Sequence, residues 1–376
     1  MSKMSAAATA AALIMAGGSH AAAPGPVFVI ALENHDFTQP STYKATEQIF
    51  GNPAAPFINS LLKAGTSAAQ DVSYATNYTN VPGVHPSEPN YVWSQAGLHG
   101  PLNDNDPYPN NIVHKPSLNA LLQAAGMTWK SYQEDTDLVT VDGKLTNTVA
   151  PSSKWTVPLV SFSGSSPTYT NPYNGSNVYG YAAKHNPPVF FKATNGGDNI
   201  KPSNPEAKYY APLQQLAVDL TNNTVADYNW ITPDLDNDMH DTLPGGFTYN
   251  GIHYTGDAAS IAQGDNFLSK VVPMIEASQA FQNGGIIVIW NDESEGGDSG
   301  KYTLTEIVIS KLTKGNAYHS AINYTHSSDL RTWQEIFGLS PTQGQAWLGG
   351  AASATSLSAL FVAGSIPPLR GPRPGQ

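Results

Sequence analysis

Two runs of apolar, mostly β-branched residues, each followed directly by carboxylate and amide side chains, constrain the fold of this chain most. Residues 27–32 lead into Glu33-Asn34, and residues 285–290 lead through an asparagine into Asp292-Glu293. An unbroken apolar run predicts a strand buried on both faces, as in a parallel sheet covered by helices. Because ligands of such sheets gather at the carboxyl ends of the strands, we expect an α/β fold with these acids at one edge. The alternative for Glu33-Asn34 is a solvated turn.

Apolar spacing and glycine stops predict the remaining elements. Helices are expected at 55–64, 116–126, 210–220, 265–276 and 330–337, and further strands at 127–132, 228–232 and 302–310. This alternation is typical of α/β folds. From about 137 to 208 the chain is rich in Pro, Gly, Ser, Asn and Tyr, which predicts a lid-like insertion containing short helices or a hairpin.

The turn around Ser87 places a hydroxyl between two prolines, in His85-Pro-Ser87-Glu-Pro-Asn90. Proline fixes its own φ and biases the preceding residue toward extended backbone, so we expect Ser87 on a stiff, exposed turn, which suits a nucleophile. The alternative is that Ser87 caps a helix beginning near Tyr91.

Three polar segments need separate interpretations. The acidic loop 234–241 is not an EF-hand, because Met239 stands at the required glycine position and Gly245 at the required glutamate position. We expect this loop, which includes His240, to form a wall of a site, with a solvated loop as the alternative. The polar loop 103–107 is expected to be a plain turn, with an approach to the site as the alternative. His185, in a Pro-rich turn, is expected to be structural.

The charge balance limits the partners of the chain. Its 18 Lys plus Arg stand against 29 Asp plus Glu, for a net charge of −11, and no basic cluster occurs, so nucleic-acid binding is not expected. An anionic substrate would need local positive charge, for which a divalent cation is the simplest source. With no cysteine, disulfides and thiolate metal sites are excluded.

The N-terminal segment predicts where the protein is located. Residues 1–23 read as a secretory signal peptide, with a disordered Ala-rich N-terminus as the alternative. No later apolar stretch is long enough to span a membrane. We therefore expect a secreted or periplasmic protein without a membrane span, and the sequence does not indicate its oligomeric state.

Several short motifs occur in the same order as in one known family. His85-Pro-Ser87-x-Pro-Asn90-Tyr91 resembles the nucleophile segment of the acid phosphatase/phospholipase C phosphoesterase family, which belongs with the alkaline-phosphatase-like enzymes. Further segments similar to that family follow in order: 33–37, 56–61, 184–187, 237–241, 292–293, and 325–328 running into 335–339. The resemblance implies an alkaline-phosphatase-like three-layer sandwich with a mostly parallel central sheet. It also implies a single phosphoesterase domain at 24–376, with the lid-like insertion at about 137–208.

The resemblance also implies a site. Glu33, Asn34, Asp292 and Glu293 would bind one divalent metal, with Ser87 Oγ at an open position. Such an all-oxygen set favours Ca²⁺ or Mg²⁺, while Zn²⁺ remains an alternative if histidines join.

In the implied chemistry, Ser87 attacks phosphorus and forms a phosphoseryl intermediate, with His85 and His240 binding phosphate oxygens or protonating the leaving group. Asn90, Asp238 and Asp241 would support these residues.

The expected function is a secreted metal-dependent acid phosphatase acting on small phosphomonoesters, with an optimum on the order of pH 5 to 6. Lack of room for further C-terminal domains favours it over the first alternative, a phospholipase C-type phosphodiesterase. The alternative of another class is a secreted, non-catalytic binding protein.

Overall fold

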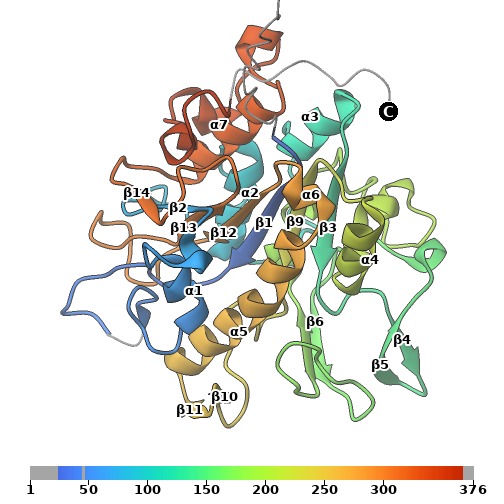
Figure 1. Ribbon diagram of the computed structural model, residues 1–376. Coiled ribbons are helices and arrows are strands. Elements are labelled where there is room, and N and C mark those ends of the chain that lie inside the picture. The colour runs from blue at the N-terminus through green and yellow to red at the C-terminus, as the bar shows by residue number, and fades with distance from the viewer. Residues whose placement is uncertain (1–23, 45–46, 367–376) are drawn as a thin grey trace, which may run out of the picture.

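A mixed eight-stranded sheet forms the centre of the protein (Figure 1). The computed structural model describes residues 24–44 and 47–366, so the predicted signal peptide, 1–23, lies outside the described residues. The strand order is β14-β2-β13-β12-β1-β9-β3-β8. In chain order the strands are β1 (Val27–Leu32), β2 (Val72–Ala75), β3 (Trp129–Gln133), β8 (Tyr210–Pro212), β9 (Tyr228–Thr232), β12 (Ile286–Asn291), β13 (Glu306–Ile309) and β14 (Tyr318–Ser320).

The sheet is mostly parallel, as expected. β1 pairs in parallel with β12 on one side and β9 on the other, and β9 and β8 flank β3 in parallel. Only β13 runs against its neighbours β12 and β2. Every residue of β1 and β12 is buried, which confirms the two apolar runs as central strands. The pairing of Leu32 with Asn291 brings the carboxyl ends of these strands to the same level.

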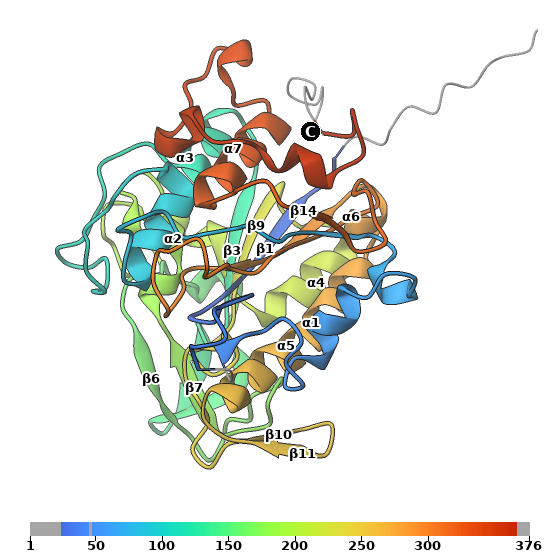
Figure 2. The same ribbon diagram turned by 90° about the vertical axis from the view of Figure 1, so that its left-hand side faces the viewer.

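Helices cover both faces of the sheet (Figures 1 and 2). One face packs against α2 (Ser87–Ala96), α3 (Leu118–Ala124) and α7 (His326–Ile336), and the other against α1 (Pro56–Leu61), α4 (Gln214–Asn222), α5 (Asp257–Glu276) and α6 (Gln279–Gln282). Alternate residues of β1 divide between the two cores, with Val29 in the first and Ile30 in the second. The predicted α/β class and three-layer arrangement are therefore confirmed. Among the described residues, no helix has the length and apolar character of a membrane span.

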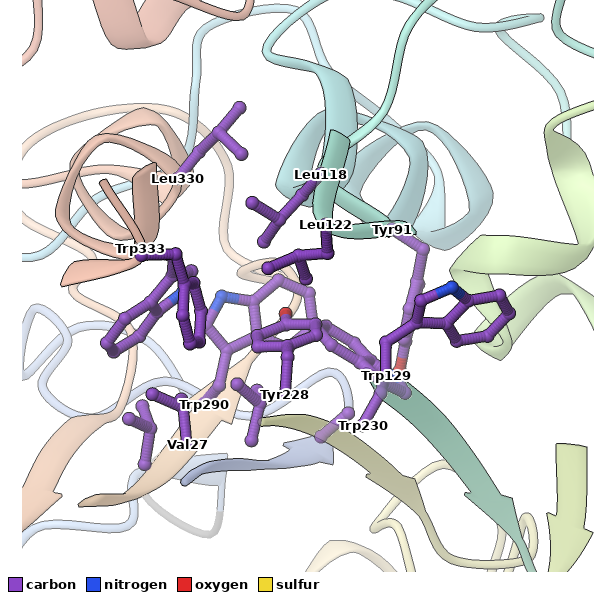
Figure 3. Close-up of a cluster of buried hydrophobic side chains, with 14 of the residues drawn as sticks. Val27, Tyr91, Leu118, Leu122, Trp129, Tyr228, Trp230, Trp290, Leu330 and Trp333 are labelled. Carbon is purple, nitrogen blue, oxygen red and sulfur yellow. The ribbon is translucent and has the colours of Figure 1, made fainter. Parts of the chain in front are cut away.

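An aromatic layer lies between α2 and the central strands (Figure 3). Tyr91 of α2 meets Trp230 of β9 and Trp290 of β12 edge to face, with ring centroids 5.9 and 5.3 Å apart. The two tryptophans meet in the same way at 5.3 Å. Such contacts hold large rings in fixed orientations, so they fix the position of α2 against β9 and β12.

The segment 137–208 contains hairpins and short helices, as predicted. It holds the pair β4 (Leu138–Val141) and β5 (Lys144–Val149), the pair β6 (Phe162–Ser165) and β7 (Val178–Tyr181), and 3₁₀ helices at 152–154, 183–185, 187–190 and 205–209. A further hairpin, β10 (Phe247–Tyr249) with β11 (Ile252–Tyr254), packs on α5. Buried Asn171 joins the segment to the sheet by donating to Glu134 Oε1 and Asp234 Oδ2 at 2.8 and 2.9 Å.

Several predicted boundaries were wrong. The helix expected at 210–220 begins with strand β8 and becomes helical at Gln214, because residues 210–212 pair with β3. The helix expected from 265 begins at Asp257. The strand expected at 302–310 is confined to Glu306–Ile309, and the helix expected from 330 begins at His326, where Thr325 supplies a capping box.

Candidate active site

Ser87 is the first residue of α2 and is buried, so the expectation of an exposed turn was wrong. The alternative of a capping serine is also wrong, because Pro86 occupies the cap position and no side chain caps the helix. The hydroxyl instead donates to Glu33 Oε2 at 2.9 Å and lies 3.3 Å from Glu293 Oε1. The N-terminus of a helix carries partial positive charge, which favours an anion beside Ser87.

The acidic residues that follow β1 and β12 lie beside Ser87. The amide of Asn34 donates to Asp292 Oδ1 at 3.1 Å, and the amide of Glu33 donates to the carbonyl of Asp238 at 2.8 Å. Asn34 adopts a left-handed φ of 59°, a conformation that asparagine tolerates better than most residues. The hydroxyl of Tyr91 donates to Glu33 Oε1. The sheet therefore brings together the predicted oxygen ligands Glu33, Asp292 and Glu293, with Asn34 joined to them through its backbone.

Two histidines, one of them not expected at the site, complete the cluster. One ligand atom each of Glu33, His185 and His240 lie within 4.8 Å of one another. His185 Nδ1 is 3.0 Å from Asp238 Oδ2, and His240 Nδ1 is 2.8 Å from Asp241 Oδ1. A carboxylate that binds Nδ1 orients an imidazole and leaves its Nε2 free for a metal. Asp238 and Asp241 are in position to do this for the two histidines.

The buried charges of the cluster fit a bound cation. Burial, followed by the charges of Asp292 and Asp238, raises the pKa of Glu33 well above its ordinary value. Burial and then Glu293 raise the pKa of Asp292 to about 7, and burial lowers the pKa of His185 well below its usual range. His185 Nε2 is buried and lies 3.3 Å from Glu33 Oε1, and Asp292 Oδ2 is buried without a hydrogen-bond partner among the described residues. A divalent cation would satisfy these atoms and stabilise the ionised carboxylates.

His85 is placed differently from the other predicted catalytic histidine. Its Nδ1 binds Glu293 Oε2 and its Nε2 lies 2.6 Å from Asp298 Oδ1, in the glycine-rich turn after β12. The hydrogen bond to Glu293, opposed by burial, raises the pKa of His85 to about 9. Asn90 Nδ2 donates to the Val84 carbonyl at 2.9 Å and lies 3.4 Å from Glu293 Oε2. His85 and Asn90 thus both lie against Glu293.

A cavity of about 450 Å³ opens beside His240 and includes Lys184. The Lys184 ammonium pairs with Asp104 Oδ2, and Asp104 Oδ1 accepts from the Glu88 amide at the start of α2 at 3.3 Å. The loop 103–107 therefore approaches the site, and its interpretation as a plain turn was wrong.

Sequence reasoning missed four contributors to the site: Tyr91, Asp104, Lys184 and His185. Tyr91 lies one helical turn after Ser87 and stacks on His185, with ring centroids 5.1 Å apart. The helical spacing of Tyr91 from Ser87 was a usable signal. His185 and Lys184 were visible only as part of the motif 184–187, while no local pattern distinguished Asp104.

The chain is similar to known phosphatases in sequence. It is 27% identical over 297 residues to the phosphatidylinositol-3-phosphatase of Mycobacterium tuberculosis, an alignment covering 78% of this chain and 73% of that protein. It is 26% identical over 289 residues to an acid phosphatase of Aspergillus fumigatus, covering 73% of this chain and 50% of the relative. The chain thus spans about half the length of the fungal protein.

Solved structures with a similar backbone share little sequence with the chain. The lipoteichoic acid synthase LtaP of Listeria monocytogenes matches with a TM-score of 0.47 and 11% identity, over 88% of this chain and 75% of that one. A protein of the alkaline phosphatase superfamily from Vibrio parahaemolyticus matches with a TM-score of 0.42 and 9% identity, over 83% and 66%.

The family assignment rests on sequence along most of the chain. The characteristic sequence of the phosphoesterase family matches residues 34–340, which include the Ser87 segment, the two histidines and the acids after β12. The chain therefore belongs to the phosphoesterase family, whose members are phosphoric ester hydrolases.

Proposed function

We propose that the protein is a metal-dependent phosphomonoesterase in which Ser87 is the nucleophile. The observation that carries this proposal is the position of the Ser87 hydroxyl, at the N-terminus of α2 and within hydrogen-bond distance of Glu33 and Glu293. Ser87 Oγ attacks phosphorus, the bond to the ester oxygen breaks, and the alcohol leaves with the bonding electrons and takes up a proton. Water then hydrolyses the phosphoserine and restores the hydroxyl.

We further propose that Glu33, His185 and His240 hold the cation. Two imidazoles and a carboxylate suit Zn²⁺ or another first-row transition metal better than Ca²⁺ or Mg²⁺, which prefer oxygen alone. When bound, the cation would lower the pKa of the serine hydroxyl and offset the charge of the phosphate. Elemental analysis of purified protein tests its identity.

The deciding experiment is an activity panel with and without chelator. The panel contains p-nitrophenyl phosphate, bis-p-nitrophenyl phosphate and a phosphatidylcholine. We expect the monoester to be hydrolysed fastest, with an acidic optimum, and chelator to abolish turnover. Faster diester or lipid hydrolysis would support the phospholipase C alternative, and no turnover of any ester would support a binding protein.

A lipid-borne monoester is a second candidate substrate, since the mycobacterial relative is a phosphatidylinositol-3-phosphatase. Phosphatidylinositol 3-phosphate therefore belongs in the panel. We also propose that the protein is secreted or periplasmic, as residues 1–23 suggest. Fractionation of expressing cells, followed by N-terminal sequencing of the protein, tests this.

A further inference from the structure

The cavity beside His240 has an arrangement of charge that the proposed chemistry does not use. Its walls include the carboxylates Asp104 and Asp106, the rings of Phe162 and Tyr181, and the basic side chains Lys184 and His240. The cavity is lined by residues of the loop 103–107 and of the segment 137–208, together with Leu235 and His240. At about 450 Å³ it is of a size that holds a small molecule.

The basic end of the cavity adjoins the Ser87 cluster. His240 shares the cluster with Glu33, and its ring centroid lies 5.5 Å from that of His185. Lys184 lines the same cavity as His240 and directly precedes His185 of the cluster in the chain. A phosphate group at Ser87 would therefore lie at this end, and the alcohol of the ester would extend into the remainder of the cavity.

Asp106 carries the negative charge that remains in the part of the cavity that would receive the alcohol. Asp104 is neutralised by Lys184. Asp106 is bound by the amide of Ser161 at 2.9 Å and by the Ser161 hydroxyl, two neutral donors, and within the described residues no cation pairs with it. Ser161 Oγ also accepts from the Ala183 amide at 2.8 Å, which fixes this arrangement next to Lys184.

Aromatic rings complete the same wall. Phe162 is 38% exposed and lies 5.5 Å from the ring of Tyr181, centroid to centroid. Such rings pack against the carbon skeleton of an alcohol and attract a cationic group through their π faces.

We infer that this cavity receives the alcohol of the phosphate ester and selects alcohols without a negative charge, with cationic and neutral alcohols preferred. The inference rests on the proposed function and names its substrate class. It also predicts that phosphatidylinositol 3-phosphate, whose alcohol carries a negative phosphodiester, is a poorer substrate than an ester of a neutral alcohol. An anionic group on the alcohol would be repelled by the negative charge of Asp106 at short range. The net charge of −11 on the protein also disfavours an anionic alcohol.

The test compares kcat/KM for three esters that carry the same phosphoryl group: choline phosphate, glycerol 3-phosphate and 3-phosphoglycerate, whose alcohols are cationic, neutral and anionic. We expect kcat/KM to fall in that order, with on the order of a tenfold difference between the extremes at low salt. Raising the ionic strength should narrow the difference, because salt screens exposed charges.

Asp106→Asn removes the negative charge of Asp106 and keeps the shape of its side chain. We expect it to raise kcat/KM for 3-phosphoglycerate relative to choline phosphate by roughly three- to tenfold. Asp142→Asn, which removes the same charge at the exposed turn between β4 and β5, should leave the ratio unchanged.

Four outcomes would overturn the inference or its basis. If the wild type hydrolyses 3-phosphoglycerate as well as choline phosphate, or if its selectivity is insensitive to salt, the cavity does not select by charge. If Asp106→Asn folds and leaves the ratio unchanged, Asp106 is not responsible. If neither these esters nor p-nitrophenyl phosphate is hydrolysed, the proposed function itself fails and the inference falls with it.

Discussion

The hydroxyl of Ser87 donates a hydrogen bond to Glu33 Oε2 at 2.9 Å, although 54 residues separate the two in the chain. Glu33 directly follows β1, and Ser87 begins α2, which packs over the same sheet. Tyr91 holds the other oxygen of Glu33 from the same helix. One helix thus fixes both the proposed nucleophile and the orientation of a carboxylate, and the position of α2 on its aromatic layer controls their separation.

Ser87→Ala should abolish turnover while the protein remains folded. Loss of a serine nucleophile lowers kcat by several orders of magnitude, and here only one hydroxyl at a helix start is removed. Acid quench with ³²P-labelled substrate should trap phosphate on Ser87 in the wild type. Ser94→Ala, which removes a buried hydroxyl bound to the Tyr91 carbonyl in the same helix, is the control and should keep its activity. Substantial activity in Ser87→Ala would contradict the covalent scheme.

Glu33→Gln and His185→Ala should lose metal and activity together, because both remove an atom of the cluster. Asp238→Asn should weaken metal binding by roughly 10- to 100-fold, since it removes the carboxylate that orients His185. Metal content by elemental analysis, and titration of the apoprotein with Zn²⁺, give readouts independent of turnover. Exposed His114→Ala is the control. Full metal content in His185→Ala would exclude that histidine as a ligand.

His240→Ala separates two roles for this residue. If His240 binds the cation, as we propose, the variant loses the metal, and the rates of hydrolysis of all esters fall by the same factor. If it is instead the general acid, metal is retained and esters of poor leaving groups suffer more than p-nitrophenyl phosphate. Metal content and the two rates, measured on the same preparation, decide between the roles.

Glu306→Gln should reduce the pH dependence of stability. Glu306 and Asp329 are both buried, and neither oxygen of the Glu306 side chain has a hydrogen-bond partner among the described residues. Burial raises the pKa of Asp329 from 3.8 to about 7 and raises that of Glu306 well above its ordinary value. The folded state therefore holds protons that the unfolded chain releases from about pH 4 upward, so this pair loses stability as the pH rises toward 7.

Glutamine is neutral at every pH, so it replaces one of these two buried titrating groups with a side chain that does not titrate. We expect Glu306→Gln to raise Tm by a few degrees near pH 7 and by less near pH 4, as measured by calorimetry across this range. An equal change in Tm at both pH values would show that the pair does not titrate in this window.

Asn171→Ala should destabilise the attachment of the segment 137–208. Its amide donates to Glu134 and Asp234, two buried carboxylates that would each lose a donor. Glu134 Oε1 keeps Asn237 Nδ2 as a donor at 3.1 Å, whereas Asp234 Oδ2 loses the Asn171 donor. An unpaired buried group costs about 1 to 3 kcal/mol, so we expect a loss of that size in the free energy of unfolding. Denaturant titration measures this loss, and exposed Asn177→Ala should be close to neutral. Susceptibility of the segment to limited proteolysis should increase in Asn171→Ala alone.

The sequence by itself determined the central strands and the acids that follow them. β1 and β12 are unbroken apolar runs, and burial on both faces of a parallel sheet is a local requirement that each run displays independently. Because parallel strands end at a common edge, the meeting of Glu33 with Asp292 followed from those runs alone. The order of the family motifs added Ser87 and His240.

Only the tertiary structure decided which distant side chains meet. His85 binds Glu293 across 208 residues, and Lys184 binds Asp104 across 80. Both pairs join irregular segments, and such segments carry no hydrophobic period from which their final position could be read. Ser87 became buried for a related reason: proline preferences fix the local backbone, while exposure depends on what packs above it, here the segment 137–208 and the turn after β12.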